Sequence, residues 1–255
     1  MTKLIRNACL FIILGAAHFV FPDPLSAELI LEPLNISRPL PGLNGTLWQT
    51  IFTIQNENDV GWTMAGSGCN TSSTVGVEDH SVAHNPVCAG GSAGIVYFLP
   101  DELSKLMFFS LRVIDLNSSS QHLGSDLPVV READALRGYT ILTGVPGYAD
   151  YRHTLRVYNL STSEIFQFTL RVFRVSDLFN SDPVFETSAS LPPAPSETGL
   201  AASSSKWDEG QELPDLGGGD EFKFEITPSS PAVPYWFFAS VTHKATNALT
   251  IVTPH

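Results

Sequence analysis

Hydrophobic residues in this chain alternate with polar residues at a period of two along several segments. The alternation places Trp48, Phe52 and Ile54 on one side of an extended segment, because successive side chains of a β-strand point to opposite faces. The same pattern recurs in residues 107–113, 166–172 and 222–226. Such alternation indicates strands with one buried and one solvated face.

Clusters of Gly, Pro, Asn and Ser separate these segments, and only residues 100–105 suggest a helical turn. Many short strands without intervening helices predict an all-β protein with an antiparallel β-sandwich rather than an α/β enzyme fold. A short internal echo supports a duplication. The tetrapeptides WQTI (48–51) and RHTL (152–155) each begin an alternating segment that ends at an asparagine, Asn56 or Asn159.

The echo predicts two immunoglobulin-like units in tandem, residues 28–147 and 148–255, each near the usual size of such a domain. Within the second unit, residues 181–220 are rich in Pro, Ser and Gly and predict a flexible excursion. An alternative architecture is a single sandwich that ends near Ser176, followed by a linker and a separate C-terminal hairpin.

The C-terminal hairpin is expected to comprise residues 235–242 and 247–253. An isolated two-stranded hairpin is only marginally stable in water. Under the two-unit interpretation we therefore expect it to dock onto a larger sheet, next to the alternating segment 222–226.

Residues 1–27 have the order of a secretory signal peptide. A basic start with Lys3 and Arg6 precedes an apolar run at 8–21, and Ala27 ends a small-residue cleavage motif. The apolar run has 14 residues, whereas a membrane-spanning helix needs about 20. We therefore expect cleavage after Ala27, a mature chain without a transmembrane segment, and a secreted, periplasmic or cell-surface location.

The formal net charge of the full chain is −12, and it becomes −13 when the leader takes away two of the 14 basic and one of the 26 acidic residues. An acidic surface repels phosphate backbones, which excludes nucleic acid as a partner. An acidic cluster at 208–221 lacks the spacing of an EF-hand. It indicates a solvated segment, with calcium binding there as the alternative, and no cofactor is predicted.

Removal of the leader takes Cys9 away and leaves two cysteines, Cys69 and Cys88. In an oxidising compartment, such a pair predicts one disulfide. Closing a loop of about 20 residues stabilises a fold by roughly 3 kcal/mol in the chain-entropy treatment.

Residues 90–94 match the G-x-S-x-G pattern of serine hydrolases, with Ser92 as the nucleophile. The pattern requires a helix after the serine, but residues 95–99 predict a strand. Upstream, His80 and His84 have a zinc-ligand spacing for a helix, with Asp79 as an oxygen ligand. A metalloprotease helix would have glutamate directly after the first histidine, where this chain has serine. The stretch therefore predicts a cross-linked surface loop, with a serine- or metal-dependent hydrolase as the alternative.

The tryptophans suggest a second alternative, a carbohydrate-binding module. Trp62 and Trp207 lie among polar residues and are candidates to face a ligand, whereas Trp236 lies in a strongly apolar segment and is expected in the core.

Several short motifs resemble a family of uncharacterised secreted bacterial proteins that has no established activity. They are LWQT (47–50) with Asn56, GSDLPVVRE (124–132), YRHTLRVY (151–158), WFFASVT (236–242) and TIVTP (250–254). The resemblance implies export and a β architecture. Together, these features predict an exported, non-enzymatic binding or structural module whose partner is an extracellular or cell-surface protein or glycan.

Overall fold

The computed structural model describes residues 27–42, 45–65, 74–85, 93–117, 124–147, 149–177, 182–213 and 220–254. This part of the chain is all-β and antiparallel, as the alternation predicts. The turn expected at 100–105 is the short helix α1 (Asp101–Ser104). Within the described ranges, no helix is long and apolar enough to cross a membrane.

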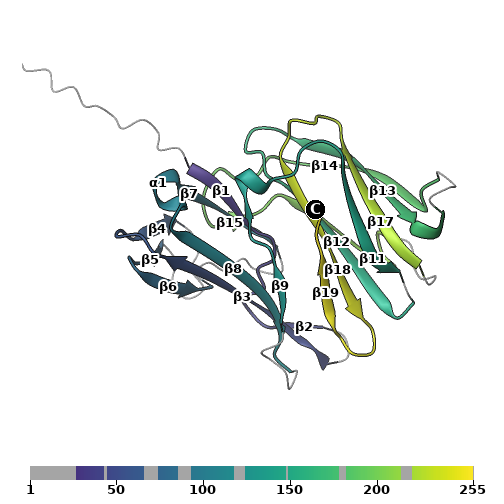
Figure 1. Cartoon of the computed structure of the whole chain (residues 1–255), viewed down its shortest axis with the longest axis horizontal. Coiled ribbons are helices and arrows are strands. Elements are labelled where there is room, and N and C mark those ends of the chain that lie inside the picture. The colour runs from purple at the N-terminus through teal and green to yellow at the C-terminus, as the bar shows by residue number, and fades with distance from the viewer. Residues whose placement is uncertain are drawn as a thin grey trace, which may run out of the picture.

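Two sheets pack around one core in the first half of the chain (Figure 1). Sheet I has the strand order β10-β1-β7-β15, and sheet II has the order β2-β3-β8-β9, with β6 also paired to β3. Their strands are β1 (Ala27–Glu32), β2 (Leu40–Pro41), β3 (Leu47–Asn56), β6 (Ser81–His84), β7 (Ile95–Pro100), β8 (Met107–Asp115), β9 (Ser125–Leu127), β10 (Val130–Arg131) and β15 (Leu200–Ala201). A separate ribbon pairs β4 (Trp62–Ala65) with β5 (Thr74–Val77).

Two further sheets enclose a second core. Sheet III has the strand order β16-β12-β18-β19, and sheet IV has the order β11-β17-β13-β14. Their strands are β11 (Thr140–Gly147), β12 (Tyr151–Asn159), β13 (Phe166–Arg174), β14 (Phe185–Leu191), β16 (Ser204–Asp208), β17 (Asp220–Pro228), β18 (Tyr235–His243) and β19 (Leu249–Val252).

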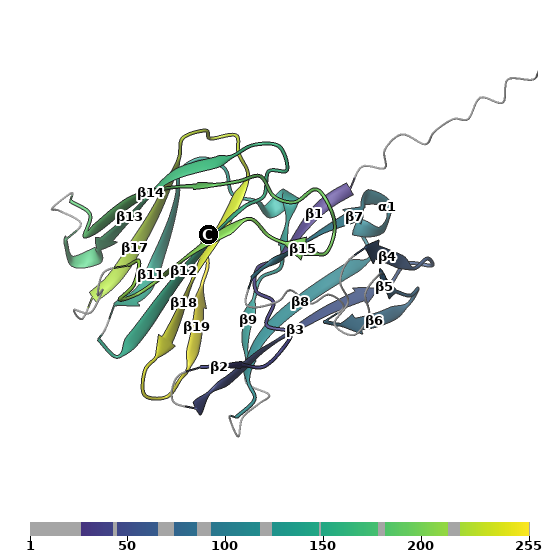
Figure 2. The ribbon, with the colours of Figure 1, turned by 180° about the vertical axis from the view of Figure 1, so that it is seen from behind.

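Sheet III contributes to both cores. In β18, Tyr235 and Phe237 belong to the second core, whereas Trp236 and Phe238 belong to the first. Figures 1 and 2 both show β18 and β19 between the strands of sheet II and those of sheet IV. Because both faces of β18 are covered, its sequence is a continuous apolar run rather than an alternating one. The expected core position of Trp236 is confirmed.

Much of the strand pairing occurs twice along the chain. In the first half, β3 pairs with β6 and β8, β8 pairs with β9, and β1 pairs with β7. In the second half, β12 pairs with β16 and β18, β18 pairs with β19, and β11 pairs with β17. The ribbon β4–β5 corresponds to the pair β13–β14, except that β13 also pairs with β17 and so belongs to sheet IV, whereas the ribbon is a separate two-stranded sheet. The internal echo of the sequence thus matches a repeated topology.

Asn56 ends β3 with a buried side chain that fastens the following turn. Its Nδ2 donates to the carbonyls of Val60 (2.9 Å) and Glu78 (2.8 Å), and its Oδ1 accepts from the backbone N–H of Asn58 (3.0 Å). Side-chain amides of this kind form hydrogen bonds with backbone groups that no longer have a partner in a neighbouring strand, because the sheet ends there.

Asn159 does the same at the end of β12. Its Nδ2 donates to the carbonyls of Glu164 and Pro192, both at 2.8 Å, and its Oδ1 accepts from the backbone N–H of Ser161 at 2.9 Å. In each half, the amide acceptors lie just after the asparagine and at the end of the later strand, β5 or β14. The two asparagines therefore occupy equivalent positions of the repeat.

Replacing either asparagine with alanine is expected to lower the free energy of unfolding by about 1–3 kcal/mol, because buried carbonyls lose their donor. Urea denaturation of Asn56→Ala and Asn159→Ala measures this loss. Asn117→Ala is the control, because its Nδ2 also donates to a carbonyl, that of Gly45 at 2.7 Å, but at an exposed site. A loss at Asn56 or Asn159 no larger than that at Asn117 would contradict the assigned roles.

The strand partition differs from that of an immunoglobulin constant domain. There, the first two strands share one sheet, whereas here β11 lies in sheet IV and β12 in sheet III. The structure therefore establishes packed antiparallel sheets with a repeated topology but not the immunoglobulin arrangement.

The segment 181–220, predicted as a flexible excursion, includes paired strands. It contains β14, β15 and β16, which pair with β13, β7 and β12 respectively. The strand β14 lies at a sheet edge and is stabilised by backbone pairing, so its small polar side chains need little burial. β15 returns to sheet I, where Leu200 lies opposite Val96, so the second half of the chain completes a sheet of the first.

The C-terminal hairpin forms as predicted, since β18 pairs with β19 and docks beside β12. Its expected neighbour is wrong, however. The strand β17 lies between β11 and β13 in sheet IV and faces β18 across the second core. Alternation identifies which side of a strand is buried but not which sheet contains the strand.

Candidate functional site

A cleft opens between sheets II and III, where the two halves of the chain meet. Its volume is about 200 Å³, and its walls come from β2, β3 and β8 on one side and from β12, β16, β18 and β19 on the other. We call it the inter-sheet cleft. Pockets for small ligands commonly occur at such junctions.

The sheet II wall of the cleft is apolar, and Trp48 is its largest side chain. Trp48 is half-buried at the open end of β3, and Leu40 of β2 is 42 % exposed beside it. A Cβ added to Gly42 would lie 2.6 Å from Trp48 Nε1, a distance that real Cβ atoms do not tolerate. The same Cβ would lie 2.2 Å from Thr46 Oγ1, so a side chain at position 42 would displace Thr46 or the indole.

The sheet III wall carries the polar groups of the cleft, beside the apolar side chains of Phe238, Leu249 and Ile251. Asp208 accepts a hydrogen bond from Thr154 Oγ1 at 2.8 Å and forms an ion pair with Lys206 Nζ at 2.5 Å. Burial acts to raise the pKa of Asp208, but the hydrogen bonds from Lys206 and Thr154 outweigh it and hold the pKa below its usual value. Asp208 is thus a fixed carboxylate in the cleft.

Two cations stand side by side on the same wall. Arg156 of β12 lies directly opposite Lys206 of β16 in the register of the sheet, and both line the cleft. Like charges at opposed positions destabilise a sheet. Asp208 offsets this repulsion, so the wall carries both signs of charge and hydroxyl groups within one small area.

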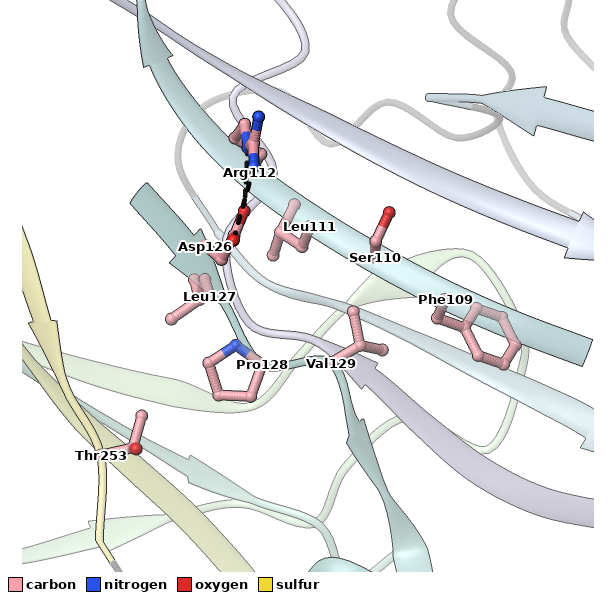
Figure 3. A pocket seen from close by; sticks show the side chains of 9 residues that line it. All are labelled: Phe109, Ser110, Leu111, Arg112, Asp126, Leu127, Pro128, Val129 and Thr253. Carbon is pink, nitrogen blue, oxygen red and sulfur yellow. Dashed lines mark hydrogen bonds and ion pairs between the residues drawn. The ribbon is translucent and has the colours of Figure 1, made fainter. Parts of the chain in front are cut away.

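A second, more open hollow lies along β8 and β9 (Figure 3). Its volume is about 640 Å³, and Figure 3 shows Arg112 and Asp126 pointing toward each other at one end of it. Their Nε–Oδ1 distance is 2.9 Å, and both side chains are substantially exposed, by 45 % and 75 %. Such an exposed pair contributes little to stability, and the hollow is a shallow surface rather than an enclosed site.

The histidine pair predicted as a metal site is not assembled. Nε2 of His80 lies 3.0 Å from Asp59 Oδ1, and Nδ1 of His84 lies 3.0 Å from Thr53 Oγ1. In the part of the chain that the structure describes, no three His, Cys, Asp or Glu side chains are grouped to hold a metal ion, so Asp79 does not complete a set with them. His80 lies in the turn before β6 with φ of 46°, and His84 is the last residue of β6, so the i, i+4 spacing of a helix does not apply to them.

Cys69, Cys88 and Ser92 lie outside the described residues. After the G-x-S-x-G pattern, the chain enters strand β7 at Ile95, as predicted, and not the helix that a nucleophile elbow requires.

Both tryptophans proposed to face a ligand are buried, which corrects that prediction. Trp62 is 4 % exposed and lies edge-on to Tyr97, with ring centroids 6.3 Å apart. Trp207 is 7 % exposed and lies edge-on to Phe168 at 5.9 Å. Their polar sequence neighbours occupy the opposite faces of the strands. Trp48 lines the inter-sheet cleft, although the alternation of the sequence predicts only that it lies on the buried face of its strand.

The motif at 124–132 has a structural role. Arg131 Nη1 donates to Glu28 Oε2 (2.7 Å) and Ser104 Oγ (2.9 Å), and its Nη2 donates to the carbonyl of Met107 (2.6 Å). The neighbouring Glu132 accepts from the backbone N–H of Leu29 at 3.2 Å. These contacts tie sheet I to sheet II where the chain crosses between them.

Two buried polar groups were not predicted from the sequence. Nδ1 of His153 lies 2.7 Å from Glu209 Oε2, and its Nε2 lies against the carbonyl of Pro146. Glu32, at the end of β1, accepts hydrogen bonds from Tyr97 and Asn35 and is fully buried. Both groups occupy inward positions of strands, and this position is the only sequence signal that marks them.

No protein-family model, curated protein or solved structure matches this chain.

Proposed function

We propose that this protein is an exported binding or structural module made of two tandem β-sandwich units, which resemble immunoglobulin domains in their two-layer antiparallel build but not in their strand partition. The observation that supports this proposal is the dual role of sheet III. Because one sheet packs against both cores, the two units are held in a fixed relation and keep the inter-sheet cleft in one geometry.

The order of residues 1–27, which is that of a signal peptide, supports export. Cleavage after Ala27 would leave the remainder of β1 paired with β7, from Glu28 opposite Leu99 onward. The oxidising compartment then allows the disulfide between Cys69 and Cys88.

Expression of the full chain in a secreting host tests the proposal. The exported fraction is expected to contain a chain that begins at Glu28 and carries the linked Cys69–Cys88 peptides, as read by mass spectrometry of a non-reduced digest. Retention inside the cell with the leader intact would overturn export, and free thiols in the exported protein would overturn the disulfide.

The same preparation separates a module from a hydrolase. The exported protein is expected to show no turnover of generic ester, peptide or glycoside substrates. Hydrolysis that is abolished by Ser92→Ala or by a metal chelator would show that the protein is an enzyme and would contradict the proposed binding or structural function.

A further inference from the structure

We propose that the inter-sheet cleft binds a sugar ring of a neutral saccharide, with Trp48 as the stacking surface and Asp208, Lys206 and Arg156 as the hydrogen-bonding groups. This inference rests on the proposed function and names its ligand class. It places the ligand away from Trp62 and Trp207, which are buried.

The two walls of the cleft differ in a way that matches a sugar. A pyranose presents a face of C–H groups and a rim of hydroxyls. The C–H face suits the apolar wall with Trp48 and Leu40, because aromatic rings pack well on such surfaces. The hydroxyl rim suits the opposite wall, where Thr154 and Ser240 add hydroxyl groups to the charged side chains.

The mixed charge of the polar wall argues against other ligand classes. A simple anion meets the carboxylate of Asp208, and a simple cation meets Arg156 and Lys206. A wholly apolar ligand would take three charged groups out of water without replacing their hydrogen bonds, which is costly. Sugar hydroxyls both donate to a carboxylate and accept from cations, so a neutral polyol satisfies all three groups.

The size of the cleft sets how much of the saccharide it accepts. Its volume of about 200 Å³ is below the range of about 300–1,000 Å³ typical of pockets for drug-sized ligands. The cleft therefore accommodates one ring, and the rest of an oligosaccharide would extend along the open side.

The opposed cations on the wall provide an independent argument. Arg156 and Lys206 lie opposite each other on neighbouring strands, and the carboxylate of Asp208 offsets their mutual repulsion. Groups that break a local rule of stability are concentrated at functional sites. The hydroxyl oxygens of a bound sugar would accept hydrogen bonds from both Arg156 and Lys206.

The test uses the full exported chain and isothermal calorimetry with hexasaccharides of β-1,4-glucan, mannan, xylan and chitin, together with an oligogalacturonate as the acidic probe. At least one neutral probe is expected to bind and to change the tryptophan fluorescence. Trp48→Phe, which keeps a ring in the cleft, and Asp208→Asn, which keeps an acceptor for Thr154, are each expected to weaken binding at least tenfold.

The control is Phe108→Ala, which removes a 52 % exposed aromatic from β8 that does not line the cleft. It is expected to leave the affinity unchanged, and thermal unfolding verifies that all three variants are folded. Absence of binding by every neutral probe would overturn the site. Binding that both cleft variants leave intact, or binding of the acidic probe alone with loss at high salt, would also overturn it.

Failure of this inference is distinguishable from failure of the proposed function. If the chain is exported and begins at Glu28 but binds no neutral saccharide, the assignment of the cleft is wrong and the proposed function as an exported module still stands. A chain retained inside the cell overturns the exported module whatever the calorimetry shows.

Discussion

Alanine at Phe237 or at Phe238 is expected to lower the free energy of unfolding by about 3–5 kcal/mol, the range for a buried phenylalanine, but through different cores. The two residues are adjacent in β18, so their side chains point to opposite faces of sheet III. Phe237 is fully buried in the second core, with its ring centroid 6.2 Å from that of Tyr235. Phe238 is 1 % exposed in the first core, with its ring centroid 6.3 Å from that of Tyr158.

Denaturant unfolding measures the two losses, and amide hydrogen exchange locates them. Phe237→Ala is expected to accelerate exchange in sheet IV, and Phe238→Ala in sheets I and II, because each variant leaves a cavity in one core. Phe108→Ala is the matched control, since its ring is 52 % exposed and its loss is expected to cost far less. Faster exchange in sheet IV alone after Phe238→Ala would show that sheet III does not support the first core.

The burial of each strand explains why the sequence predicts most strands correctly. Alternation located β3, β8, β13 and β17, because each has one face toward a core and one toward solvent. In β18 the apolar run marks burial on both faces. The short echo ending at Asn56 and Asn159 predicted a repeat because those two amides perform the same structural task.

The arrangement of strands into sheets was less predictable. Nothing in the alternation of Phe222, Phe224 and Ile226 distinguishes a neighbour of β18 in one sheet from a strand that faces it across the core. β15 was missed for a different reason. It has only two residues, both exposed, and it is held by backbone pairing of Leu200 with Val96, which side-chain composition does not reveal.

The candidate site was predictable only in part. The sequence identified tryptophans as the informative side chains, but it favoured the two with polar neighbours, which are buried. The polar wall forms because Asp208 of β16 lies opposite Thr154 of β12. That register depends on a segment, 181–220, for which the composition predicts no strand at all.

The largest effect of pH is expected at Glu32, which is fully buried at the end of β1. Its Oε2 accepts from the hydroxyl of Tyr97 at 2.7 Å, and its Oε1 accepts from Nδ2 of Asn35 at 2.9 Å. Desolvation by burial outweighs these two hydrogen bonds and raises the pKa of Glu32 to about 8 from the usual 4.5. Over most of the physiological range, the folded protein therefore holds this carboxyl neutral.

The sign of the pH dependence follows from proton linkage. A carboxyl whose pKa is higher in the folded state binds protons more tightly there, so its contribution to stability is complete below pH 4.5 and is lost as the pH rises to about 8. At about 1.4 kcal/mol per pKa unit, the loss over this window is at most about 5 kcal/mol. The pKa of Tyr97 is raised well above its usual value by burial and by Glu32, so its hydroxyl does not titrate in the window.

Glu32→Gln isolates this contribution, because glutamine keeps a hydrogen-bonding amide of nearly the same shape and has no proton to release. The free energy of unfolding of the wild type is expected to fall relative to that of Glu32→Gln between pH 4.5 and 8 and to run parallel to it outside this window. Urea unfolding of both proteins at matched pH values measures the difference, in which all other titrating groups cancel. Parallel curves through the whole range would show that Glu32 ionises in the folded protein as it does in the unfolded chain, and that its burial has no consequence for the pH dependence of the fold.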